Sequence, residues 1–460
     1  MSLAERITSV VEAYRAEHDI PGAAIAVVQD GAITYEGGFG QANLETGAAP
    51  TPHTLWPIAS LTKSFTGVAA MQQVERGRLL LDEPITSYLP DFRFADPEAS
   101  RKITVRNLLL HAGGIGRSGH QDTLREISDE AYPTREQLVS ALETAVQQSA
   151  PNTAWSYSNE GYATAGHAIE TAADEPLEDL FQHGIFDRVG MTNTHPRFQN
   201  WREAEDRAIP YGRENVGPFD SGEQHGHYTV IRLPRDYRAF LSTGGTCSTA
   251  HDLARYQIAT MRTEDSPLLS AGSLDNAHSA QLQYGDSGWG YGFGWQVMWS
   301  RDDTRVIGHS GGLPGVSNYS LVVPAERTGV VVLTNRNDRT GMNLAELLIN
   351  EVREEPLFRF SLDEPLPFES QYEATREGLS EYAGTYEFRM GPATVEATDR
   401  GVLIRTPSRY DAHEVRIDAL AVGPDVFLGR FRAEPIYFMR DGAGAIRGFT
   451  HIGYYYPRTA

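Results

Sequence analysis

The spacing of apolar residues at the start of the chain predicts one helix followed by a strand pair. In residues 3–14, apolar side chains recur every three or four positions, which predicts an amphipathic helix. The apolar run Ala23–Val28, the dipeptide Asp30-Gly31 and the strand-like run 32–36 follow. Because Asp-Gly readily adopts the positive φ angles of a tight turn, these residues predict a β-hairpin.

Helical spacing dominates the middle of the chain, and strand patterns return after it. Apolar residues recur at helical intervals from Ser60 to Gly77, and three β-branched runs within 305–335 predict antiparallel strands closed by a helix over 342–353. Five more helices are predicted at Thr104–Leu110, Thr134–Ala145, Gly161–Ala173, Leu177–Phe186 and Ala250–Arg262. We therefore predict an α+β fold, an α/β/α sandwich in a domain spanning 1–355. Its antiparallel sheet comes from about 20–50 and 290–355, with a mainly helical subdomain over about 60–285.

The last part of the chain has a different pattern. Prolines at 356, 365 and 367 predict a linker over 356–378. Short alternating segments separated by turns follow, and no long helical pattern occurs. Residues 379–460 are therefore predicted to form a separate, small all-β domain of barrel type.

The charge balance excludes some classes of partner. The chain has 61 acidic and 40 basic residues, a formal net charge of -21, which should repel nucleic acids and anionic membrane surfaces. Lysine occurs only at Lys63 and Lys102, so arginine supplies the other positive charges. This composition fits a salt-adapted protein and an acidic protein from a GC-rich bacterium equally well.

The cysteine count and the N-terminal sequence narrow the expected cofactors and location. Cys247 is the single cysteine, which excludes an intrachain disulfide and a cysteine metal site, and we expect neither metal nor cofactor. Charges recur through residues 1–20, so no signal peptide is expected, and no apolar run is long enough for a membrane span. These features predict a cytoplasmic protein without membrane contact, and they leave self-assembly into a homo-oligomer open.

Ser60 and Lys63 form the first chemical motif. Three residues apart on a helix, their side chains project from one face and can hydrogen-bond. A serine hydroxyl is a poor nucleophile, but an amine that burial holds uncharged can take its proton. Arginine cannot do this, so a lysine retained here in a chain that otherwise uses arginine favours a catalytic role.

Two further motifs follow in the sequence. In Trp155–Asn159 an extended backbone would turn Tyr157 and Asn159 to the same side, where a phenol can relay protons and an amide can orient a carbonyl. In Gly308–Gly312 the glycines would let a substrate lie against a strand edge, and His309 could hold a carboxylate or pass a proton. His111, beside Gly113 and Gly114, is interpreted as a hydrogen-bonding group of a loop.

Together these motifs resemble the S-x-x-K, Y-x-N and K/H-x-G set of the serine β-lactamase and penicillin-binding-protein superfamily. The segments 104–115, 185–191 and 291–295 extend the resemblance, which covers Leu55 to Asn335. It implies that Ser60 is the acylated nucleophile, Lys63 its activating amine and Tyr157 the proton relay. It further implies substrate contacts by Asn159, His309 and Gly311, and an oxyanion hole of the Ser60 and Gly312 N–H groups. The last domain resembles the lipocalin-like domain of some members.

The third motif departs from the common pattern, since histidine replaces lysine. The resemblance then favours a peptidase or amidase, which could be selective for D-amino acids, or an esterase. The expected substrate is a small molecule or a short peptide. A β-lactamase, or a penicillin-binding sensor with slow turnover, is the alternative. Gly308–Gly312 also matches G-x-S-x-G, so an α/β-hydrolase with Ser310 as nucleophile is a further hypothesis, although that class needs a helix after the serine.

Overall fold

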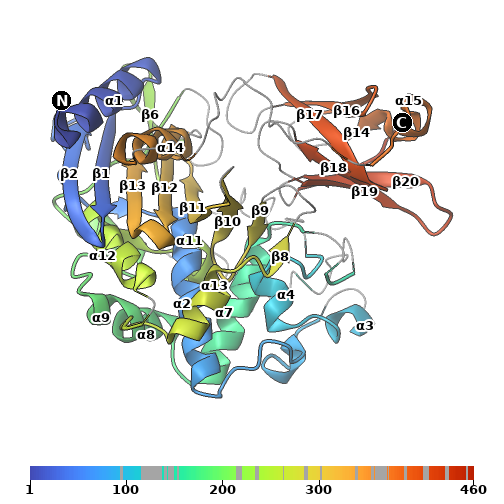
Figure 1. Cartoon of the computed structure of the whole chain (residues 1–460), viewed down its shortest axis with the longest axis horizontal. Coiled ribbons are helices and arrows are strands. Elements are labelled where there is room, and N and C mark those ends of the chain that lie inside the picture. The colour runs from blue at the N-terminus through green and yellow to red at the C-terminus, as the bar shows by residue number, and fades with distance from the viewer. Residues whose placement is uncertain are drawn as a thin grey trace.

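A large antiparallel sheet organises the first part of the chain. In a computed structural model, eight strands are hydrogen-bonded in the order β2-β1-β13-β12-β11-β10-β9-β8, so the first hairpin joins strands from the other end of the region (Figure 1). The predicted α+β fold, with one sheet built from both ends, is confirmed. The strands are β1 (Gly22–Gln29), β2 (Ala32–Gly40), β8 (Leu282–Gln283), β9 (Trp289–Tyr291), β10 (Gln296–Trp299), β11 (Arg305–Leu313), β12 (Val316–Val323) and β13 (Thr328–Thr334).

The structure describes most of the chain. The described residues are 1–93, 97–115, 137–138, 142, 150–152, 155–213, 220–233, 238–262, 264–283, 289–300, 303–336, 340–353, 357, 370, 372–387, 391–407, 414–429, 435–451 and 454–459. The predicted helix Thr134–Ala145 and the predicted linker 356–378 lie mostly outside them.

Strand β1 shows why the sheet is covered on both faces. Ala24, Ala26 and Val28 contribute to a core shared with the helical region, whereas alternate residues such as Ile25 contribute to a second core. That second core includes α1 (Leu3–Glu17) and α14 (Thr340–Val352), which lie together on one face of the sheet in Figure 1. The sheet is therefore the middle layer of a sandwich.

The first hairpin forms as its turn residues predict. Asp30 and Gly31 have φ angles of 51° and 74°, the pair of positive values that a tight two-residue turn requires. Val28 pairs with Ile33 and Gln29 with Ala32 on either side of this turn. Local turn chemistry thus sets the register of the pairs beside the turn, and an irregularity between Val27 and Val28 shifts the register of the rest of the hairpin.

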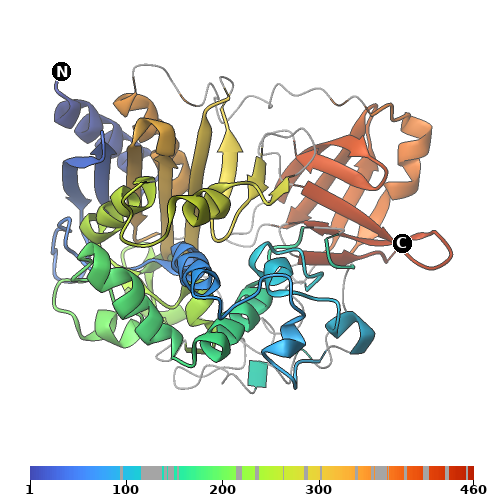
Figure 2. The same cartoon turned by 60° about the horizontal axis from the view of Figure 1, so that its bottom comes forward.

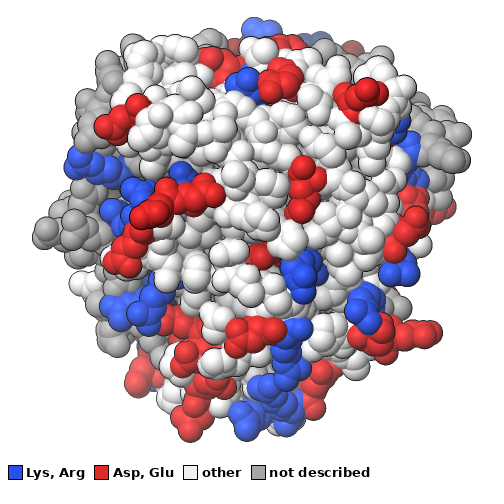
Figure 3. Space-filling view, turned by 90° about the vertical axis from the view of Figure 1, so that its left-hand side faces the viewer, with Lys and Arg blue, Asp and Glu red and all other residues white. Residues whose placement is uncertain are grey.

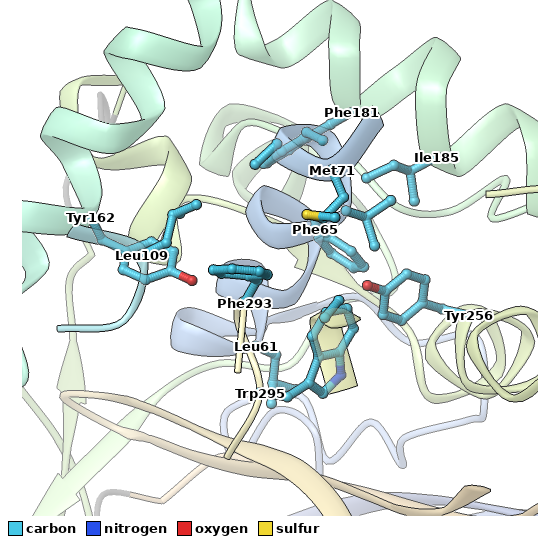
Figure 4. Close-up of a cluster of buried hydrophobic side chains, with 14 of the residues drawn as sticks. Leu61, Phe65, Met71, Leu109, Tyr162, Phe181, Ile185, Tyr256, Phe293 and Trp295 are labelled. Atoms are coloured by element: carbon cyan, nitrogen blue, oxygen red, sulfur yellow. The ribbon is translucent and has the colours of Figure 1, made fainter. Parts of the chain in front are cut away.

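Helix α2 (Thr62–Glu75) runs through the centre of the helical region and is buried on every side over residues 62–73. Figure 4 shows Phe65 of this helix pointing into a cluster of apolar side chains from several elements. The Phe65 ring makes edge contacts with Phe181, Phe186 and Tyr256. Such burial holds the N-terminal end of α2 in a fixed position, because a packed core tolerates little displacement.

The other helices of this region lie close to the positions that the sequence predicts. Helix α7 begins two residues earlier than predicted, and the predicted helix 177–186 continues from α8 into a π-helical turn. The described members include α4 (Val105–Leu109), α7 (Asn159–Ala173), α8 (Leu177–Phe181), α10 (Phe198–Glu203), α11 (Leu241–Gly244), α12 (Ala250–Met261) and α13 (Ala271–His278). Two small sheets, β3 (Trp56–Pro57) with β7 (Cys247–Ser248) and β4-β6-β5 within 211–231, were not predicted.

The C-terminal part is a separate barrel-like sheet, as predicted (Figures 1 and 2). Its eight strands pair in chain order, and a bridge between Tyr386 and Arg458 joins the first strand to the end of the last. Aromatic rings pack inside it: Phe438, for example, contacts Tyr382 and Phe427. The strands are β14 (Gly384–Tyr386), β15 (Ala393–Ala397), β16 (Gly401–Pro407), β17 (Glu414–Gly423), β18 (Val426–Gly429), β19 (Pro435–Arg440), β20 (Ile446–His451) and β21 (Tyr454–Pro457).

The acidic excess does not form a single patch on the face beside α1 and β2. Figure 3 shows this face with acidic and basic side chains interspersed and a wide uncharged area between them. Arg15 pairs with Glu12 and Arg6 with Glu351 near these elements. Among the described helices, none combines the length and apolar character that a bilayer crossing requires.

Candidate active site

Ser60 lies in a 3₁₀ turn, Ala59–Leu61, that leads directly into α2. Ala59 has a φ of 50°, in the left-handed region that residues with a β-carbon rarely adopt. The Thr62 hydroxyl donates to the Ala59 carbonyl over 2.7 Å and holds this turn closed. Ala59 and Leu61 are buried while Ser60 is partly exposed, so the strained turn presents the serine hydroxyl at the surface.

The segment before Ser60 is fixed to the sheet. Strand β3 pairs with β7, and the amide nitrogen of Asn318 on β12 donates to the Pro57 carbonyl over 2.9 Å. The other end of the same amide, Asn318 Oδ1, accepts from the Thr334 N–H on β13 over 3.1 Å. The position of Ser60 therefore depends on strands that lie far away in the sequence.

Lys63 is fully buried and lies beside Ser60 as the motif predicts. Its Nζ lies 3.2 Å from Ser60 Oγ, 2.9 Å from Asn159 Oδ1 and 2.8 Å from the Thr243 carbonyl oxygen. An uncharged amine in this place would donate to the amide and the carbonyl and accept from the serine hydroxyl. Only that uncharged form has the lone pair with which an amine can take the serine proton.

Tyr157 and Asn159 converge on the same amine. Nζ of Lys63 lies 4.9 Å from the centre of the Tyr157 ring, and 5.4 Å from that of Tyr162. Asn159 is the first residue of α7, whose N-cap Ser158 accepts from the Gly161 N–H over 2.9 Å. Since Asn159 Oδ1 accepts from Lys63, its amide nitrogen is the end that can donate to a substrate carbonyl.

His309 lies on β11 with only 2% of its surface exposed. Its Nδ1 donates to the Ser310 carbonyl over 2.6 Å, so its Nε2 accepts from the Tyr291 hydroxyl, 2.9 Å away. Burial is the main cause that lowers the pKa of His309 to about 3. The ring is thus neutral at ordinary pH and supplies no fixed positive charge, although its contact with a substrate stays a prediction.

Gly311 and Gly312 have different surroundings. A β-carbon at Gly311 would lie 2.2 Å from the Ile58 carbonyl oxygen and 3.1 Å from Leu61 Cγ, so only glycine lets β11 approach the turn that holds Ser60. At Gly312, which is exposed, a β-carbon would meet nothing within 4 Å. The first glycine is needed for packing, and the second leaves open space beside the strand.

This contrast predicts different outcomes for two alanine substitutions. Gly311→Ala should lower the free energy of unfolding by about 2 kcal/mol or more, because β11 must move away from the Ser60 turn. Gly312→Ala, the matched control, should change it by less than about 0.5 kcal/mol. Urea unfolding of both variants measures the difference, and equal midpoints would contradict this account.

Ser310 lies in a setting that argues against the α/β-hydrolase hypothesis. It occupies the interior of β11, where it pairs with Tyr319 of β12. The chain then turns at residues 314–315 directly into β12. A nucleophile elbow requires a strand, a sharp turn and then a helix, whereas the element that follows β11 here is the strand β12.

Some groups around Lys63 were not predicted. The Thr243 carbonyl of α11 is a main-chain group, and no residue type marks it in a sequence. Tyr291, which the sequence places in a motif without a role, bonds to His309. Within the described residues, no group of three or more His, Cys, Asp or Glu side chains is arranged to hold a metal ion.

Comparisons with known proteins agree with this architecture. The sequence profile of the family described as Beta-lactamase matches residues 7–354. Penicillin-binding protein 4 of Amycolatopsis lactamdurans is 29% identical over 347 residues, covering 70% of this chain and 83% of that protein. Penicillin-binding protein 4* of Bacillus subtilis (strain 168) is 26% identical over 465 residues, which cover 95% of this chain and 97% of that protein. The structure of the octameric penicillin-binding protein homologue from Pyrococcus abyssi has a TM-score of 0.63 at 23% identity, and the match covers 95% of this chain and 96% of that one.

Proposed function

This chain belongs to the β-lactamase family of serine hydrolases, and on that premise we propose that it cleaves amides and esters through an acyl ester on Ser60. The observation that carries the proposal is the distance of 3.2 Å between Ser60 Oγ and the buried Nζ of Lys63. A general base must lie within such reach of the proton that it removes. Tyr157 and Asn159 lie around the same amine and supply the remaining polar groups.

The proposed first step forms the ester. The uncharged amine of Lys63 takes the Ser60 hydroxyl proton as Oγ bonds to the acyl carbon, and the carbonyl electron pair moves onto oxygen. The N–H groups of Ser60 and Gly312 stabilise that oxyanion. When the tetrahedral intermediate collapses, the bond to the amine or alcohol breaks, and the leaving group takes a proton that Tyr157 relays from Lys63.

The second step releases the product. A water molecule attacks the ester carbonyl and passes its proton to the same amine and phenol pair. The bond between the acyl carbon and Ser60 Oγ then breaks, Oγ regains a proton, and the carboxylic acid leaves. No cofactor enters either step, because both are acyl transfers that need only a nucleophile, a proton acceptor and oxyanion donors.

We propose short peptides, amides and small esters as the substrate class, with selectivity for a D-residue beside the cleaved bond. The neutral His309 supports this choice over β-lactams, because it gives no fixed positive charge for the carboxylate of such an antibiotic. The alternative is a β-lactamase or a penicillin-binding sensor with slow turnover. The names of the two penicillin-binding relatives favour that alternative.

A panel of four chromogenic substrates tests the substrate class. We expect steady turnover of p-nitrophenyl acetate. We also expect the turnover rate of D-alanyl p-nitroanilide to exceed that of its L-isomer by roughly tenfold or more. For nitrocefin we expect kcat/KM roughly 10- to 100-fold below that of the preferred substrate, as for a lost contact to a charged group. Equal cleavage of the D- and L-amides would remove the stereochemical part of the proposal. A single stoichiometric burst with every substrate would favour the sensor.

A further inference from the structure

His111 packs against the segment that carries Tyr157. It follows the short helix α4 and its C-cap Leu110, has a φ of 57°, and only 2% of its surface is exposed. A residue with a β-carbon in the left-handed region is strained, and such a conformation persists only where the surroundings maintain it. The contacts of His111 therefore need an explanation beyond that of an ordinary loop residue.

One residue binds the main chain on both sides of Tyr157. The carbonyl oxygen of His111 accepts from the Ser156 N–H over 2.8 Å, and its Nδ1 accepts from the Ser158 N–H over 3.1 Å. A main-chain N–H can only donate, so Nδ1 carries a lone pair and the ring proton lies on Nε2. These two bonds fix the extended conformation that directs the Tyr157 side chain.

The imidazole also supports the phenol ring itself. Its centre lies 4.3 Å from that of Tyr157, with 36° between the ring planes. On other sides it contacts Tyr162 at 5.0 Å and Tyr291 at 4.8 Å. Tyr291 is the residue that bonds to His309, and Tyr162 lies beside Lys63. His111 is thus packed among the aromatic side chains that surround the amine.

We propose that His111 is a positioning residue for the Tyr157 proton relay. No described contact joins it to Ser60 or Lys63. It acts through its bonds to Ser156 and Ser158 and its ring contact with Tyr157, which hold the phenol beside the Lys63 amine. The bond to Ser158 also fixes the residue that caps α7, and so the start of the helix that carries Asn159. This inference rests on the proposed function, because it assumes that Tyr157 relays protons.

Three variants separate the two contacts of the imidazole. His111→Asn keeps an acceptor near the place of Nδ1 and tolerates a positive φ, but loses the ring. His111→Phe keeps a ring and leaves the buried Ser158 N–H without its acceptor. His111→Ala loses both. If the acceptor holds Tyr157 in place, kcat for p-nitrophenyl acetate should fall roughly 10- to 100-fold in His111→Phe and His111→Ala, with KM within about threefold of wild type.

His111→Asn is the rescue variant, and we expect its kcat to stay within about fivefold of wild type. Leu348→Ala is the stability control, since Leu348 of α14 is buried in the core on the other face of the sheet. It should lower Tm as much as the His111 variants do and leave kcat unchanged. A merely structural role of His111 would instead make kcat follow Tm in all four variants.

The possible outcomes are distinct. Loss of kcat in His111→Phe and His111→Ala with retention in His111→Asn supports the inference. Wild-type kcat in a folded His111→Ala, or a loss in a folded His111→Asn as large as in the alanine variant, overturns it. If alanine and phenylalanine prevent folding, the asparagine variant alone decides. Absence of any ester hydrolysis by the wild-type chain would instead overturn the proposed function.

Discussion

A fluorophosphonate probe should label the wild-type chain at a single serine, Ser60, and Ser60→Ala should abolish both labelling and turnover. Ser60 is partly exposed at the end of a buried helix, with the Lys63 amine 3.2 Å from its oxygen. Because alanine removes the atom that forms the acyl bond, we expect kcat/KM to fall by roughly 10⁴-fold or more. Intact-mass spectrometry of the labelled protein, followed by peptide mapping, measures the site.

Ser310→Ala is the matched control for this experiment. Ser310 is also a partly exposed serine close to the site, but it lies inside strand β11. The variant should label and turn over like the wild type, apart from any effect on substrate docking along the strand. Labelling that survives Ser60→Ala and disappears in Ser310→Ala would assign the nucleophile to Ser310 and end the present proposal.

Lys63→Arg should reduce turnover by roughly 10³-fold, although it keeps a long basic side chain. The guanidinium of arginine stays charged and cannot accept the serine proton. It is also larger than the amine, while the space around Nζ is bounded by Ser60, Asn159 and the Thr243 carbonyl. Initial rates with p-nitrophenyl acetate, and the rate of fluorophosphonate labelling, measure the loss.

Lys63→Met separates chemistry from folding. Methionine has a similar length, carries no charge and suits a buried position, so this variant should keep the fold while losing the base. Thermal unfolding should give a single cooperative transition that shows a folded protein, and turnover should be as low as in Lys63→Arg. If either folded variant retained activity within tenfold of wild type, Lys63 would not be the base.

The sequence predicts the fold well where local signals are strong. The Asp30-Gly31 turn, the alternation of the later strands and the long apolar helix after Ser60 each have a direct signature, and each is found close to its predicted place. The short strands β3 and β7 have none, because two residues give too little pattern to distinguish a strand. They pair only because the surrounding core brings them together.

The identity of the side chains in the candidate site was easier to predict than their main-chain contacts, backbone strain and protonation. The motifs name Ser60, Lys63, Tyr157 and Asn159, and the structure brings them together around one amine. The Thr243 carbonyl has no side-chain signature, and the strain at Ala59 results from the turn's surroundings. The neutrality of His309 likewise depends on its burial, which follows from tertiary packing.

The pairing of β1 with β13 has a consequence for the order of synthesis. Ser60 and Lys63 leave the ribosome early, whereas β11, β12 and β13 emerge only near the end of this region. Until then Pro57 lacks its bond to Asn318, and Gly312, the proposed oxyanion donor, has not been synthesised. Contacts this distant in sequence form late. We therefore expect a nascent chain to show no hydrolase activity until translation has passed the last strand of the sheet.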